Sequence, residues 1–216
     1  MIEHTDITIL GTTTLRNRLG INDSKQLATA EADLVALRLA ELRIAPIPGG
    51  FDSVHLQDIH HHIYQDLYDW AGELRRADAG NRAASEVATS LNAVFDRLAR
   101  ENYLKGRSPE EWSKSVSTYI HELGTIQPFL TSSEVALREF ADELARKNNL
   151  SLQWDCAPEI GANHLMRHLD QSEQSANIRR MVMLAMDADT GSLRPSRGTV
   201  AERGIDRLFS AGTPIP

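Results

Sequence analysis

The chain has 216 residues, a formal net charge of -7 and a single cysteine, Cys156. This length is sufficient for one domain with a core that needs no disulfide bond, and a lone cysteine cannot form an internal bridge. The net acidity argues against a general nucleic-acid binder. No window contains the roughly 18 consecutive apolar residues that a membrane span needs, and the N-terminal residues do not resemble a secretory signal. A reducing, cytoplasmic location is therefore expected.

Long segments rich in Ala, Leu, Arg and Glu favour an all-α domain. Residues 1–22 are expected to be irregular. Ser24 is the predicted N-cap of a first helix, which ends before the breaker at residues 46–50. The apolar positions of this helix predict a wide core-facing surface: Leu27, Leu34, Val35, Leu37, Leu39 and Leu42.

The next helix has apolar residues spaced by three and four positions and is expected to end at Ala71 and Gly72. Its predicted core positions are Leu56, Ile59, Ile63, Leu67 and Trp70. The same segment carries His55 and the run at residues 60–62. Consecutive helical residues point about 100° apart, so three consecutive histidines cannot bind one ion. Surface and packing roles are therefore favoured over a metal site.

Residues 73–81 form an extended segment and turn, the one stretch with strand character. A helix is expected at about 85–102. Ser108 begins another, because Ser-Pro-Glu-Glu combines an N-cap, a proline at the first position and a glutamate three residues on. This helix is expected to continue to Ile126.

A loop at residues 127–131 interrupts the helical pattern, which resumes near Ser132 and ends near Asn148. Apolar residues at helical spacing are the predicted core positions of these three helices: Val87, Leu91, Val94, Phe95, Leu98, Trp112, Val116, Tyr119, Ile120, Leu123, Ile126, Leu137, Phe140, Ala141 and Leu144. Shorter helices are expected near 158–169 and 172–187, and a short one near 200–209 in a C-terminal tail.

The C-terminal part also carries candidate binding residues. His164 and His168 are spaced to share a metal, but no further ligand is placed near them, so surface roles are favoured. Several arginines are candidates for binding an acidic partner, with a solvated tail as the alternative: Arg179, Arg180, Arg194, Arg197, Arg203 and Arg207. No cofactor and no resident metal are expected.

Three stretches carry a family resemblance: LRNRLGINDSKQLATAEADLVALRLAEL, IHHHIYQDLYDWAGELRR, and the segment from YIHELGTIQPFLTSSEVALR to ARKNNLSLQW. They resemble Fic-domain proteins, enzymes that typically transfer AMP from ATP to hydroxyl groups of target proteins. The resemblance implies an all-α bundle of about seven or eight helices with a small β-hairpin flap. Residues 1–190 would form this domain, and 191–216 the tail.

The loop between the two central helices departs from the family pattern, His-x-Phe-x-acidic-Gly-Asn-Gly-Arg-x-x-Arg. In register, Gln127 stands at the catalytic histidine and Thr131 at the acidic metal ligand. The Gly-Asn-Gly-Arg positions hold Ser132, Ser133, Glu134 and Val135, whereas Phe129 and Arg138 are retained. Glutamine cannot accept a proton near neutral pH, and threonine is a poor magnesium ligand. Valine removes a guanidinium that would bind phosphate.

The replacements also predict a capping box, in which Thr131 and Glu134 satisfy the helix N-terminal donors that a phosphate would otherwise meet. Glu134 adds a negative charge that repels phosphate. The flap, at residues 78–85, is short and has no aromatic clamp.

These departures predict a pseudoenzyme, not an enzyme, that binds a protein partner without nucleotide, nucleic acid or membrane insertion. By the resemblance, such a protein would be an inhibitor or regulator of conjugative transfer, of type IV secretion or of a toxin, encoded on a bacterial plasmid or other mobile element. The alternative is a transferase with a rewired site that modifies protein hydroxyls with a nucleotide- or phosphate-derived group, using Gln127, Glu134 or His121. A regulatory or nucleic-acid binder acting through the arginine tail is a third reading, which the acidity disfavours.

Overall fold

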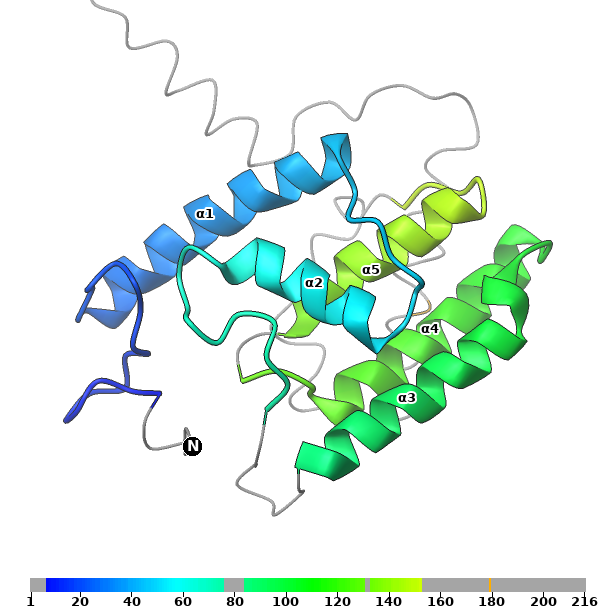
Figure 1. Ribbon diagram of the computed structural model, residues 1–216. Helices are drawn as coiled ribbons and strands as arrows, with labels where there is room; N and C mark the ends of the chain where they lie inside the picture. The colour runs from blue at the N-terminus through cyan, green and yellow to red at the C-terminus, as the bar shows by residue number, and fades with distance from the viewer. Residues whose placement is uncertain (1–6, 76–83, 131–132, 153–178, 180–216) are drawn as a thin grey trace, which may run out of the picture.

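The computed structural model describes residues 7–75, 84–130, 133–152 and 179 (Figure 1). These parts of the chain are helical, which confirms the predicted fold class. The elements are α1 (Ser24–Ile44), α2 (Ser53–Tyr64), α3 (Ala84–Arg100), the 3-10 turn η2 (Asn102–Leu104), α4 (Pro109–Ile126) and α5 (Ser133–Lys147). Within the described ranges, β pairing is limited to two isolated bridges, Thr8 with Leu15 and Leu74 with Phe129. The turn of the expected flap and the helices expected after residue 157 lie outside these ranges.

The helices form a bundle around α2 and α5, which pack against each other (Figure 1). On one side, α1 packs on α2. On the other side, α3 and α4 lie side by side, and α4 also contacts α5. The loop between α4 and α5 therefore joins two helices of the central packing, so its ends are fixed by the core.

Short polar side chains begin the helices. Ser108 accepts a hydrogen bond from the Glu111 amide, and the Glu111 carboxylate accepts one from the Ser108 amide, which confirms the predicted capping box of α4. Ser24 as the cap of α1 is wrong by one residue. Asp23 accepts from the Gln26 amide at 2.8 Å, because its carboxylate, one position earlier, reaches the free donors of the first turn.

Helix α2 ends at Tyr64, seven residues before the predicted end. The amides of Leu67 and Tyr68 both donate to the Tyr64 carbonyl at 3.0 Å, which tightens the chain into a turn. Leu67 and Trp70 are nevertheless buried. Their spacing predicted burial correctly, but the turn residues are held in the core by packing and not by a continued helix.

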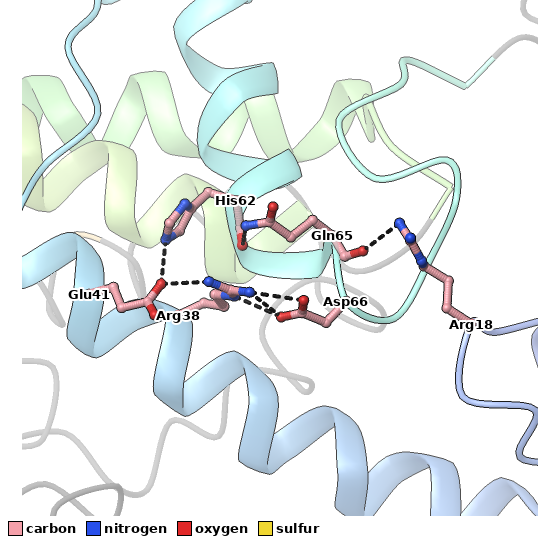
Figure 2. A network of polar contacts seen from close by, with 6 residues as sticks. All are labelled: Arg18, Arg38, Glu41, His62, Gln65 and Asp66. Carbon is pink, nitrogen blue, oxygen red and sulfur yellow. Dashed lines mark hydrogen bonds and ion pairs between the residues drawn. The ribbon is translucent and has the colours of Figure 1, made fainter.

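A polar network fixes this turn to α1 (Figure 2). The Arg38 guanidinium donates to both carboxylate oxygens of Asp66, at 2.7 and 2.9 Å, and to Glu41 at 2.8 Å. Glu41 also lies 3.1 Å from His62 Nε2 of α2. Arg18 donates to the Gln65 carbonyl at 3.1 Å, so the N-terminal segment is joined to the same turn.

The core consists of the apolar faces predicted for α2, α3, α4 and α5, which are all buried: Leu56, Ile59, Ile63, Val87, Leu91, Val94, Phe95, Leu98, Trp112, Val116, Tyr119, Ile120, Leu123, Ile126, Leu137, Phe140, Ala141 and Leu144. Helix α1 is the exception. Leu27 and Leu42 are buried, but Leu37 is 47% exposed. Because α1 packs mainly on α2, only one side of it is covered. None of the described helices combines the length and apolarity that crossing a bilayer requires.

Replacing Ser108 with Ala removes the side-chain acceptor of the α4 capping box. The free energy of unfolding is expected to fall by about 1 kcal/mol, measured by urea denaturation. Thr118→Ala, at an exposed position on the same helix, is the control and should cause no comparable loss. Equal stability of Ser108→Ala and the wild type would contradict the role of the box.

Candidate functional site

The loop that joins α4 to α5 begins at Gln127, the position that resembles the catalytic histidine. Gln127 is the C-cap of α4 and has φ 49° and ψ 66°, in the left-handed region. Its amide donates to the Gly124 carbonyl at 3.2 Å, and its side chain is exposed. A residue with a side chain adopts this conformation at a cost of roughly 1–2 kcal/mol. Other contacts must therefore hold the backbone here.

Arg75 supplies these contacts. Its main-chain N–H donates to the Pro128 carbonyl at 2.8 Å, its Nη2 donates to the Ile126 carbonyl at 2.8 Å, and its Nε donates to the Gln127 carbonyl. The residue is only 6% exposed. The last carbonyls of a helix have no partners within the helix and carry partial negative charge, so a guanidinium stabilises them.

Leu74 and Phe129 add an antiparallel bridge beside these hydrogen bonds. Residues 74–75 and 128–129 thus form a short two-stranded contact, although they are more than 50 positions apart in the sequence. The predicted extended character of residues 73–81 is observed here as far as Arg75, and residues 76–83 lie outside the described ranges. Sequence reasoning did not assign a role to Arg75. The available signal was its place at the end of the second stretch that resembles the family.

Phe129 in turn rests on His60 of α2. The two rings are stacked, with centroids 3.8 Å apart and planes inclined by 22°. His60 is fully buried and its Nδ1 accepts a hydrogen bond from the Gly72 amide at 2.9 Å. Burial lowers the pKa of His60 to about 3, with a smaller contribution from the charge of His61. His60 is therefore neutral at physiological pH, with its proton on Nε2.

The other histidines of α2 also pack against nearby groups. His61 Nδ1 lies 2.9 Å from the Ala71 carbonyl, and His55 Nε2 lies 2.9 Å from a Glu143 carboxylate oxygen. These positions agree with the predicted packing roles. The described ranges contain no group of three or more His, Cys, Asp or Glu arranged to hold a metal ion.

Beyond the loop, Ser133 is the first residue of α5 and Glu134 lies in its first turn. Both are half-buried, as is Val135, which packs against the core. Arg138 follows one turn later and is half-buried. Glu134 and Arg138 each have interaction partners.

Some predicted residues are not described. Thr131 and Ser132 fall outside the described ranges, so the capping box assigned to Thr131 and Glu134 stays a prediction. The same holds for His164, His168 and most of the arginine set: Arg180, Arg194, Arg197, Arg203 and Arg207. Arg179 is helical and exposed, as a binding residue needs to be.

His121 lies on α4, six residues before Gln127. It is 4% exposed, and neither ring nitrogen has a hydrogen-bond partner among the described residues. A side chain enclosed in this way has no direct access to a substrate in solvent. Its side chain is therefore less accessible to a substrate in solvent than that of the half-buried Glu134.

Comparisons with known proteins identify the family. The chain is 35% identical over 149 residues to a protein of Salmonella typhimurium LT2 named Probable protein adenylyltransferase Fic, a match that covers 67% of this chain and 74% of the relative. It is 33% identical over 145 residues to the protein of the same name in Escherichia coli K12, covering 65% of this chain and 72% of the relative. No protein-family model matches.

The fold agrees with this result. The crystal structure of the N-terminal Fic domain of a putative cell filamentation protein from Bartonella quintana superimposes with a TM-score of 0.71 at 20% identity, covering 84% of this chain and 95% of that chain. The helical fold and the sequence identity together define a protein of the Fic class. The chain belongs to the Fic family of protein adenylyltransferases.

This membership contradicts the prediction that the chain is not an enzyme, because both relatives are named protein adenylyltransferases. The prediction depended on the side chains at a few loop positions, chiefly Gln127 and residues 131–135. The identity of 35% over 149 residues to a named adenylyltransferase overturns it.

Acidification provides a test of the neutral state of His60. Its folded pKa, about 3, lies below the ordinary value of 6.5. The unfolded chain therefore binds the proton first as pH falls. The stability contributed by the neutral ring is complete above pH 6.5 and declines between pH 6.5 and about 3, by up to about 1.4 kcal/mol per pH unit.

In His60→Gln this decline is expected to be shallower, which urea denaturation at pH 7 and pH 5 measures. The difference between the two proteins removes the contribution of all other titrating groups. An equal loss of unfolding free energy between pH 7 and pH 5 in wild type and variant would contradict the neutral state of His60.

Proposed function

We propose that this chain is a protein-modifying transferase that attaches a nucleotide-derived group, AMP from ATP in the first instance, to a hydroxyl group of a target protein. The observation that carries the proposal is the 35% identity over 149 residues to a protein named as an adenylyltransferase. The contacts of Arg75 with the Ile126 carbonyl and of His60 with Phe129 support it, because they fix the backbone where α4 ends.

The reaction is a displacement at phosphorus. The hydroxyl oxygen of the target attacks the α-phosphorus of ATP, the bond from that phosphorus to the pyrophosphate oxygen breaks, and pyrophosphate leaves. The proton of the hydroxyl must go to a base. Gln127 cannot accept it, since an amide is not basic near neutral pH.

We assign the proton acceptor to Glu134. It is the first carboxylate after the loop and lies in the first turn of α5, with part of its surface exposed. His121, the other titratable group considered from the sequence, is enclosed in the bundle. A carboxylate at Glu134 accepts the proton and releases it to solvent after the product leaves.

The residues do not fit a resident metal ion. Thr131 stands where the family's acidic ligand would be, and a hydroxyl is a poor replacement for a carboxylate on magnesium. Magnesium would enter with the nucleotide, as part of the substrate. The N-terminus of α5 favours the phosphates through its dipole, and Arg138, one turn later, is the candidate cation for them.

The protein partner expected from the sequence is, in this proposal, the substrate. A role in regulating conjugation, secretion or a toxin would then follow from the protein that is modified. The expectation that no nucleotide binds is the outcome that would contradict the proposal.

Incubation with α-³²P-labelled ATP, magnesium and a bacterial lysate is expected to label protein, with CTP, GTP and UTP tested in parallel. Glu134→Gln keeps the shape of the side chain but removes its basicity, so labelling should fall at least about 100-fold. Glu86→Gln, which changes the exposed first-turn glutamate of α3, is the matched control and should have no effect. Absence of label with every donor would overturn the proposed function.

Gln127→His places an imidazole at the exposed C-cap of α4. Because histidine titrates near neutral pH, the variant is expected to transfer label at least about tenfold faster than the wild type. Gln127→Asn, which adds no base, is the control for any change in backbone. A folded Gln127→His variant with an unchanged rate would show that residue 127 does not face the reacting hydroxyl.

A further inference from the structure

We propose that Arg75 is a positioning residue that orients residue 127 by binding the backbone at the end of α4. The inference rests on the proposed function for its kinetic consequences, although its structural basis is independent. Arg75 binds three consecutive carbonyl groups, those of Ile126, Gln127 and Pro128.

One of the three hydrogen bonds comes from the main chain of Arg75 and two come from its side chain. The main-chain N–H binds Pro128 and aligns the two segments, beside the Leu74–Phe129 bridge. The guanidinium binds the two carbonyls that precede Pro128, where α4 ends. Substitution of the side chain therefore removes the bonds to residues 126 and 127 while the main-chain bond can persist.

The orientation of residue 127 depends on these side-chain bonds. Its left-handed backbone is a conformation that an ordinary residue leaves readily when nothing holds it. Without the guanidinium, the carbonyls of Ile126 and Gln127 lose their charged donor and can turn toward water. Rotation of these peptides redirects the side chain at position 127, whereas Phe129 stays stacked on His60.

A positioning role differs from a general structural role in what it changes. If Arg75 orients residue 127, its loss in the Gln127→His variant reduces the rate of the chemical step and leaves nucleotide affinity nearly unchanged. Misplacement of a reacting group by about 1 Å is sufficient for a large loss of rate. If Arg75 only stabilises the bundle, the surviving folded protein reacts at the normal rate.

The kinetic test uses the Gln127→His background, where residue 127 itself takes part in proton transfer. Arg75→Gln is expected to lower kcat at least about tenfold, with KM for ATP changed less than about threefold. Arg75→Lys, which keeps the charge and one donor, should recover part of kcat. Arg97→Gln is the control, because Arg97 also holds α4, through Glu122 and Tyr119, but does not contact the loop.

An unchanged kcat in folded Arg75→Gln overturns the positioning role, and so does an equal loss in Arg97→Gln. A loss confined to KM also overturns it. Circular dichroism at the assay temperature establishes that each variant is folded before its rate is compared.

Hydrogen exchange separates this proposal from the proposed function, because it requires no nucleotide. In Arg75→Gln, amides in the segments 127–130 and 73–75 are expected to exchange at least about tenfold faster, while those of α1 are unchanged. Unchanged exchange in the loop overturns the proposal whether or not the chain transfers label. If exchange rises but no variant labels protein, the proposed function fails and the role of Arg75 in holding the loop remains.

Discussion

The contact of Arg75 with the end of α4 is the constraint on which the loop depends. A helix that ends inside a protein leaves carbonyl groups that need donors, and at Ile126 and Gln127 a single buried guanidinium provides them. The same residue contributes its main-chain N–H to Pro128. One residue from a distant part of the sequence thus determines how the chain leaves α4.

The surroundings of Arg75 explain why this contact is rigid. The preceding turn is bound to α2, where His60 accepts the Gly72 amide and stacks on Phe129. Gly72 has φ 83°, and a Cβ there would lie 2.8 Å from the Cβ of His61, so the turn approaches the helix as closely as a backbone can. A neutral, buried imidazole suits this place, because a charged ring would be poorly solvated. The loop is therefore supported by the core of the bundle.

Different residues of the loop bear on its chemistry and on the support of its backbone. Gln127, at the position that resembles the family's catalytic histidine, carries an amide, while Phe129 is buried and packed. The exposed side chain of residue 127 and the buried side chain that supports the backbone thus belong to different residues. The residue types at the loop positions alone predicted a pseudoenzyme. The matched relatives, in contrast, are named as enzymes. In the proposed transferase, Glu134 takes the proton-accepting role.

The sequence by itself determined the helical class, the buried faces of α2 to α5, the capping box at Ser108 and the resemblance to the Fic family, because each depends on spacing within one segment. It predicted an end of α2 that is too late, and it predicted wrongly that Leu37 is buried. Both errors arise because these features depend on which neighbours cover a segment. The support of the loop by Arg75 was decided only by the tertiary structure. The donor and the acceptors are separated by about 50 residues in the sequence. No local sequence pattern predicts to which carbonyl a distant arginine will donate.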